Sequence, residues 1–204
     1  MGNREALLAG AKRCLREKGY ARTTARDIAA ASGVSLAAIG YHFGSKEALL
    51  NEAMVEAIGE WGDAIERALA ADVDLVADPL ERFEAVWAGL IATLSAERPL
   101  WAASFESFAE IDRLPEVRRI LADALQQGRL GLTALFFPDA LAAGQPTQAV
   151  GSFYQALVSG VAAQWLVDPE RAPSAHELAV ALRTIAGMVA PTAEADTANF
   201  PDHQ

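Results

Sequence analysis

The 204-residue sequence has little of what most enzymes and membrane proteins need. Its single cysteine, Cys14, excludes a disulfide within the chain. The three histidines, His42, His176 and His203, lie far apart, so no pair has the spacing of a metal site. There is no phosphate-binding glycine loop, and no apolar run is long enough to span a membrane. We therefore expect no enzyme activity, cofactor, metal or membrane partner, and a cytoplasmic location.

Helix is the secondary structure that the composition favours. Hydrophobic residues make up 52% of the chain, alanine and leucine are dominant, and β-branched runs are few. Apolar residues recur at helical spacing over about nine segments, and no strand pattern fits better. The expected helices cover about residues 4–18, 24–32, 35–43, 46–70, 83–94, 101–108, 116–137, 147–167 and 174–190. The sequence thus predicts an all-α protein, with a chain break around Pro138, Gly144 and Pro146 and a disordered tail over 191–204.

Residues 24–49 have the pattern of two short helices joined by a tight turn and followed by a third helix. Thr24 can cap the first of these helices, and Asp27, three residues later, can complete a capping box. Gly33 suits the left-handed conformation that ends a helix, and Ile39, six residues later, suits the buried anchor of the next. This spacing is typical of a helix-turn-helix, whose second helix enters the major groove of DNA.

The charge is distributed unevenly along the chain. The net charge of −10 argues against a nucleic-acid partner when the chain is taken whole. The first fifty residues, however, hold eight basic residues against four acidic ones, whereas the remainder holds nine arginines against twenty-three acidic residues. Binding to phosphates needs local positive charge, so this asymmetry supports DNA binding by the N-terminal part.

Five short motifs occupy this N-terminal part: Thr23-Thr24, Asp27-Ile28-Ala29, Ser32-Gly33-Val34-Ser35, Tyr41-His42-Phe43 and Ser45-Lys46-Glu47-Ala48-Leu49. Together they resemble the DNA-binding domain of the TetR (tetracycline repressor) family of bacterial transcription regulators. The motifs cover about the first quarter of the chain, and the remainder fits the family in length and helical character. The resemblance implies a three-helix helix-turn-helix domain over 1–47 and a helical ligand-binding and dimerisation domain over 48–190.

The start of the second short helix is where base contacts are expected. Its residues are apolar or small, so direct reading there would use contact with thymine methyl groups. By the resemblance, Arg26 would contact bases, with a surface salt bridge as the alternative, and Tyr41 and His42 would contact phosphates. Thr24 and Lys46 lie at helix N-termini, where they could hold a phosphate. The expected DNA-binding residues are Thr24, Arg26, Ser35, Leu36, Ala37, Ala38, Gly40, Tyr41, His42 and Lys46.

An apolar stripe in the middle of the chain has two interpretations. By spacing alone it would be plain core, whereas the resemblance implies a small-molecule cavity, whose aromatic walls would suit a flat or apolar ligand. Glu106 and Glu110, one turn apart, would accept a cation if they faced inward, or form a solvated acidic face if they did not. The expected pocket residues are Phe83, Trp87, Leu90, Trp101, Phe105 and Phe108.

The last two long helices have the pattern of a dimer surface. Small residues that permit close packing alternate there with large apolar ones, and two copies of such a helix pair would form a four-helix bundle. The alternative is a monomer that buries the same residues internally. The expected interface residues are Phe153, Leu157, Gly160, Val161, Trp165, Leu178, Leu182 and Ile185.

These observations predict a homodimeric transcriptional regulator, and the resemblance to the TetR family implies that it is a repressor, with an activator as the alternative. It would bind a roughly palindromic double-stranded operator and leave it when an unknown small, largely apolar molecule binds. The alternative is a helical small-molecule-binding protein whose DNA binding is weak or vestigial. A steep dependence of specific DNA binding on salt would separate the two.

Overall fold

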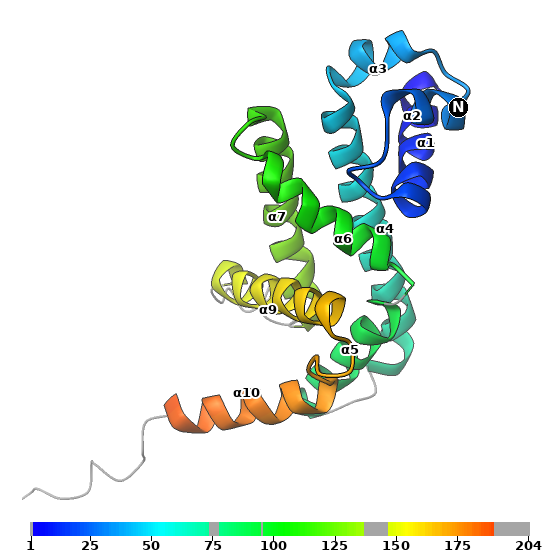
Figure 1. Ribbon diagram of the computed structural model, residues 1–204. Helices are drawn as coiled ribbons and strands as arrows, with labels where there is room; N and C mark the ends of the chain where they lie inside the picture. Colours follow the sequence, from blue (N-terminus) through cyan, green and yellow to red (C-terminus); the bar gives the residue numbers. More distant parts are fainter. Residues whose placement is uncertain (1, 74–77, 95, 137–146, 190–204) are drawn as a thin grey trace, which may run out of the picture.

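The structure, a computed structural model, describes residues 2–73, 78–94, 96–136 and 147–189. Within these ranges it contains helices and no strand, which confirms the all-α prediction. The elements are α1 (Asn3–Lys18), α2 (Ala25–Ser32), α3 (Leu36–Phe43), α4 (Lys46–Val73), α5 (Pro79–Leu94), α6 (Arg98–Ser107), the 3-10 helix η1 (Phe108–Glu110), α7 (Pro115–Phe136), α9 (Thr147–Val167) and α10 (Ala175–Val189). Figure 1 shows α1–α3 gathered at one end of the molecule, with α4 leading from them to the remaining helices.

The helix boundaries follow the sequence pattern closely. Helix α5 begins at Pro79, one turn before Phe83, the first residue of its apolar stripe. The reason is local: the carboxylate of Asp78 accepts hydrogen bonds from the backbone amides of Leu80 and Glu81, at 2.7 and 3.0 Å, and so caps the helix. The expected break around Pro138 and the expected tail over 191–204 lie outside the described residues.

Two apolar clusters form the core. The first unites α1–α3 with the first half of α4, and it also receives Leu100 and Ala103 from α6. Its fully buried large side chains include Leu7, Leu15, Ile28, Leu49, Leu50 and Met54. α4 runs without interruption past residue 47, where the sequence placed a domain boundary, and its buried residues as far as Ala57 belong to this first cluster. The two-domain division remains a prediction.

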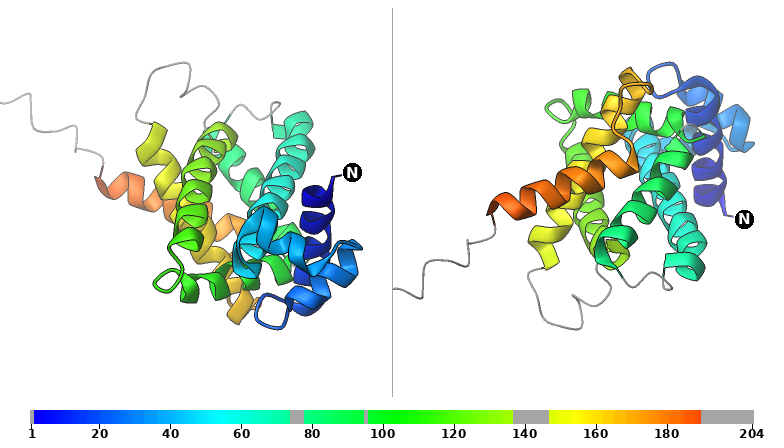
Figure 2. Two further views of the ribbon diagram at one scale, coloured as in Figure 1. Left: turned by 90° about the horizontal axis from the view of Figure 1, so that it is seen from above. Right: turned by 90° about the horizontal axis from the view of Figure 1, so that it is seen from below.

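The second cluster fills the space between α5, α6, α7, α9 and α10, and aromatic rings dominate it. Phe83 and Trp87 of α5 pack against Phe136 of α7, with ring centroids 5.7 and 5.9 Å away. Phe136 in turn stacks on Tyr154 of α9 at 4.0 Å. Figures 1 and 2 show α10 crossing below α5 and pointing away from the other helices at its C-terminal end.

No helix in the described ranges has both the length and the apolar character required to cross a bilayer.

One glycine, Gly10, allows α1 to pack closely against the C-terminal end of α2. Gly10 of α1 lies directly against the end of α2, so that a Cβ at this position would be 2.9 Å from the Cβ of Ser32 and 3.0 Å from its backbone nitrogen. The first contact is closer than real Cβ atoms come to other atoms, and the second, with a backbone atom, is tighter than most real Cβ contacts. Gly10 therefore sets the distance between α1 and the helix-turn-helix.

We predict that Gly10→Ala destabilises the protein by about 1–3 kcal/mol, because the added methyl group must push α1 and α2 apart. Urea denaturation followed by circular dichroism measures the change. Gly59→Ala is the matched control, since a Cβ at Gly59 in the interior of α4 meets nothing within 4 Å. The control should gain about 0.5–1 kcal/mol, because alanine favours helix more than glycine does. Equal stability of Gly10→Ala and wild type would contradict the close-packing argument.

Candidate DNA-binding surface and interior cavity

The N-terminus of α2 is fixed by the capping box that the sequence predicts. The Thr24 hydroxyl accepts a hydrogen bond from the Asp27 amide at 3.2 Å, and the Asp27 carboxylate accepts one from the Thr24 amide at 2.9 Å. Lys18 of α1 joins this network, with its ammonium 2.5 Å from the carboxylate. The hydrogen bond from Lys18, followed by those from Thr24, lowers the pKa of Asp27 well below its ordinary value. The network thus ties α2 to α1.

The turn between α2 and α3 also follows the sequence pattern. Gly33 ends α2 with φ 69° and ψ 16°, the left-handed conformation that favours glycine. The next helix is anchored by Ile39 and Phe43, each only 4% exposed. Ser35 stands at the N-cap of α3, but its hydroxyl makes no capping hydrogen bond with any described residue. One face of α3 is therefore held in the core, and the other is open.

The open face carries most of the expected DNA-binding residues. Tyr41 is 86% exposed, and its ring meets His42 edge-on at 4.8 Å between centroids. On α2, the exposed Arg26 has no ion-pair or hydrogen-bond partner among the residues described. Ala38 and His42 are half-buried, and the other expected positions on α3 and its N-cap are exposed: Ser35, Leu36, Ala37 and Gly40.

Two expected phosphate ligands already have partners within the protein. The Lys46 ammonium donates to the Thr23 carbonyl at 3.1 Å and lies 3.2 Å from the Glu47 carboxylate. The Thr24 hydroxyl donates to Asp27 at 2.7 Å. Both residues lie at helix N-termini as expected, but these contacts compete with any phosphate. The Lys46 contact joins residues 23 positions apart, so no local pattern could have indicated it.

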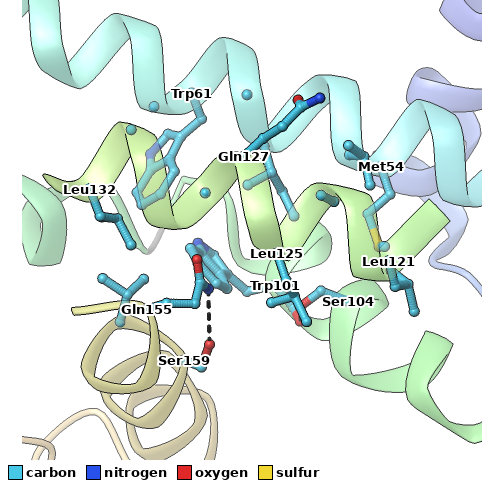
Figure 3. Close-up of a pocket in the computed structure, with 18 of the residues that line it drawn as sticks. Met54, Trp61, Trp101, Ser104, Leu121, Leu125, Gln127, Leu132, Gln155 and Ser159 are labelled. Carbon is cyan, nitrogen blue, oxygen red and sulfur yellow. Dashed lines mark hydrogen bonds between the residues drawn. The ribbon is translucent and has the colours of Figure 1, made fainter. Parts of the chain in front are cut away.

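A cavity of about 390 Å³ lies between α4, α6, α7 and α9 (Figure 3). Of the six expected pocket residues, Leu90, Trp101, Phe105 and Phe108 line it. Phe83 and Trp87 do not, because their rings pack into the aromatic cluster with Phe136 and Tyr154. For these two residues the core interpretation of the stripe holds. The pocket function of the other four remains a prediction.

Much of the cavity wall comes from residues that the sequence did not single out. α4 contributes Met54, Ile58 and Trp61, and α7 contributes Leu121, Leu125 and Leu132. Trp61 is held in place because its indole N–H donates to the Thr93 hydroxyl at 2.9 Å. It meets Trp101 edge-to-face, with centroids 5.3 Å apart. Helical spacing can indicate which side of α7 faces inward, but it cannot show that this side faces a cavity.

Helix α6 connects the cavity to the DNA-binding domain. Trp101 and Phe105 face the cavity, whereas Glu106 faces the opposite way and accepts a hydrogen bond from the Ala21 amide, between α1 and α2, at 2.9 Å. Glu106 is exposed and does not line the cavity, so of the two alternatives for this residue the condition for cation binding in the pocket is not met. A second contact between the same parts joins Arg16 of α1 to Glu97, just before α6, at 3.7 Å.

The expected dimer residues divide by exposure. Phe153 and Ile185 are 47% and 57% exposed, and a Cβ at Gly160 would meet nothing within 4 Å. Val161 is only 4% exposed, because it faces the second cluster of its own chain, so it is not available to a partner. The remaining residues are half-buried against that cluster: Leu157, Trp165, Leu178 and Leu182. The C-terminal half of α10 adds two further exposed apolar residues, Met188 and Val189.

The fold defines a helix-turn-helix protein with a second, cavity-bearing helical part, and comparison with known proteins is consistent with this. The model of the family of bacterial regulatory proteins named tetR matches residues 7–53. The HTH-type transcriptional repressor AcnR of Corynebacterium efficiens is 45% identical over 49 residues, which are 24% of this chain and 26% of that protein. AcnR of Corynebacterium glutamicum is 47% identical over 47 residues, 23% and 25% of the two chains. The matched segment thus spans about a quarter of the length of these relatives.

Solved structures share the fold over nearly the whole chain. The multidrug binding protein EbrR, complexed with imidazole, is 22% identical, with a TM-score of 0.64 over 89% of this chain and 95% of that one. A TetR transcription regulator from Haloarcula marismortui is 21% identical, with a TM-score of 0.58 over 91% and 95%. Residues 7–53 thus match the TetR family of bacterial regulatory proteins in sequence, and the rest of the chain shares the fold of the solved structures. Because the matched family consists of regulators, the expectation that the chain is not an enzyme is confirmed.

The low pKa of Asp27 makes the capping network sensitive to acid. The network stabilises the fold fully above the carboxyl's ordinary pKa of 3.8, and this contribution is lost as the pH falls through the lower pKa of the folded state. We expect Asp27→Asn to lower the melting temperature at pH 7, and the difference from wild type to shrink as the pH approaches 2. Thermal melts between pH 2 and 7 test this. Asp123→Asn on the exposed side of α7 is the control, and a pH-independent effect of Asp27→Asn would contradict the linkage.

Proposed function

We propose that this chain is a homodimeric transcriptional repressor that binds a roughly palindromic DNA operator and leaves it when a small, largely apolar ligand binds. The observation that carries the proposal is the open face of α2 and α3. Ile39 and Phe43 anchor α3 in the core, and the opposite face presents Arg26 and Tyr41 to solvent without competing partners in the described chain. A helix held this way can enter a major groove without rearranging the domain.

The chemistry of this face indicates how DNA would be read. Leu36 and Ala37 carry no hydrogen-bonding side-chain atoms, so their contribution to specificity would be contact with thymine methyl groups. Arg26 can make a bidentate contact with guanine. The hydroxyls of Ser35 and Tyr41 are free to donate to phosphates, which fixes the register of the helix but carries no sequence information.

Communication between ligand and DNA would run through α4 and α6. α4 begins directly after the helix-turn-helix and lines the cavity with Met54 and Trp61. α6 lines the cavity with Phe105 and contacts the α1–α2 loop through Glu106. A ligand that prefers one arrangement of these two helices would change the spacing of the two recognition helices in a dimer. It can shift the equilibrium only as far as its affinities for the two arrangements differ.

The exposed apolar side chains of α9 and α10 support a dimer. Phe153, Ile185 and Met188 are 47%, 57% and 80% exposed, an arrangement that is costly for an isolated chain in water. A two-fold axis through such a surface would bring two copies of each helix together. The same symmetry is the reason to expect a palindromic operator.

Different relatives support the two parts of the proposal, DNA-binding repression and small-molecule binding. The AcnR proteins, which match the helix-turn-helix region, are named transcriptional repressors. EbrR, which shares the fold, is named a multidrug binding protein. The alternative function, a helical small-molecule-binding protein with weak or vestigial DNA binding, is favoured by the engagement of Lys46 and Thr24 within the protein.

The test is selection of genomic fragments by the purified protein, followed by titration of the enriched DNA at two salt concentrations. The proposal predicts an enriched palindrome and a steep loss of affinity with salt, because phosphate contacts release counterions. Recovery of fragments without a common motif, or affinity independent of salt, would favour the alternative.

Within the selected operator, we predict that Arg26→Ala costs about 1–3 kcal/mol of binding free energy and relaxes the preference at one base pair. The exposed Arg113 is the control, since it lies outside the DNA-binding domain and its replacement by alanine should leave affinity unchanged. Fluorescence anisotropy with the operator and its single-base variants measures both effects. Operator affinity of Arg26→Ala equal to that of the parent would remove Arg26 from the contact surface.

For the dimer, we predict that Ile185→Glu converts the protein to monomers, because it places two like charges in the proposed interface. Leu130→Glu is the control: Leu130 is similarly exposed, at 50%, but lies on α7. Sedimentation velocity gives the mass of each variant. A dimeric Ile185→Glu protein would show that the interface lies elsewhere.

A further inference from the structure

The cavity's polar and charged groups are few and unevenly placed, and this determines which ligands it can hold. Among its described lining residues there is no lysine, arginine or histidine, and the only charged side chain is Asp63, which is exposed. An anionic ligand would therefore lose its hydration without gaining a counter-charge, which is strongly unfavourable in an apolar site. A cation would meet its partner only at the exposed edge.

Four uncharged polar side chains line the cavity: Ser104, Gln127, Gln155 and Ser159. Gln127 is exposed, so the half-buried amide that a ligand would meet is that of Gln155. Its nitrogen donates to the Ser159 hydroxyl at 3.4 Å, and its carbonyl oxygen accepts no hydrogen bond from any residue that the structure describes. Figure 3 shows Gln155 and Ser159 reaching from α9 towards Trp101. The carbonyl oxygen and the second N–H of the Gln155 amide thus remain available to a ligand.

The lack of a side chain at Gly128 of α7 leaves room for the Gln155 amide. A Cβ at Gly128 would be 2.5 Å from the Gln155 carbonyl oxygen, so any larger residue would displace the amide. The amide consequently lies against α7, where its plane is restricted on one side. The surrounding walls are aromatic, because Trp61 and Trp101 meet at an interplanar angle of 85° and Phe105 also lines the space. A planar ring can stack on one of these surfaces and contact the edge of another.

We propose that the cavity takes planar, uncharged aromatic ligands that carry a carboxamide-like edge, and that Gln155 reads this edge through a paired donor and acceptor. The inference rests on the proposed function, in which this cavity is the effector site, and names the chemical class of the effector. An amide edge offers one N–H to the Gln155 oxygen and one carbonyl to its N–H, so both polar groups of Gln155 find a partner on the ligand.

Three probes of the same shape test the charge requirement: naphthalene-2-carboxamide, naphthalene-2-carboxylate and naphthalene-2-carboxamidine, which are neutral, anionic and cationic. Isothermal titration of the full chain should show the carboxamide binding about tenfold or more tightly than either charged probe. Equal or tighter binding of the carboxylate or the amidine overturns the proposal. So does failure of the carboxamide to saturate the protein at millimolar concentration.

Variants of Gln155 test the role of the residue itself. Gln155→Leu should weaken carboxamide binding about tenfold and abolish the preference over the charged probes, whereas Gln164→Leu, on the exposed side of α9, should keep both. Gln155→Glu preserves the shape and adds a negative charge, so it should shift the preference to the amidine even if the leucine variant folds poorly. An unchanged ranking in Gln155→Glu would show that another group reads the ligand.

The ligand proposal and the proposed function can fail separately. DNA binding is measured on the same protein preparation, with and without the carboxamide. Absence of specific DNA binding would defeat the repressor function while leaving the ranking of the three probes to decide the ligand class. Specific DNA binding together with equal affinities for the three probes would defeat only the ligand class.

Discussion

The packing of α6 between the two apolar clusters is the contact on which the remaining arrangement depends. The neighbouring residues Leu100 and Trp101 point into different clusters, Leu100 towards the DNA-binding domain and Trp101 towards the cavity. A helix shared in this way cannot move in one cluster without disturbing the other, because protein interiors are closely packed. Glu106 adds a directional hydrogen bond to the same junction. The two parts of the chain are therefore mechanically joined, although the sequence presents them as separate domains.

The two surfaces of the helix-turn-helix differ in how they are stabilised. Its inner side is fixed by apolar packing and by the network of Lys18, Asp27 and Thr24. Its outer side makes few internal contacts among the described residues: the ring of Tyr41 meets that of His42 edge-on, and His42 meets Phe43 in the same way. The residues that stabilise the helix-turn-helix are thus different from the exposed residues that could contact DNA. Lys46 and Thr24 have hydrogen-bond partners within the protein, so a phosphate contact by either residue would compete with those bonds.

The sequence predicted the helix-turn-helix better than the cavity, and the reason is the range of the interactions. The capping box and Gly33 act over three or four residues, so a linear pattern contains them completely. Phe83 and Leu90 lie on the same helical stripe, yet one packs against other rings and the other faces a cavity. Helical spacing identifies the inward side of a helix but not what it meets. The contact of Gly10 with α2, and that of Glu106 with Ala21, depend on the tertiary fold and left no local signal.

The α7–α9 pair is the least adjustable part of the cavity. A Cβ at Gly151 of α9 would lie 2.3 Å from the Arg129 carbonyl oxygen of α7, so the two backbones are almost in contact and cannot rotate past each other. Gly151 is buried at this internal crossing of α7 and α9. Because α7 and α9 are fixed relative to each other, any change in the size of the cavity must come from movement of the helices on its other side, α4 and α6. The helices able to yield to a ligand are thus the same ones that reach the DNA-binding domain.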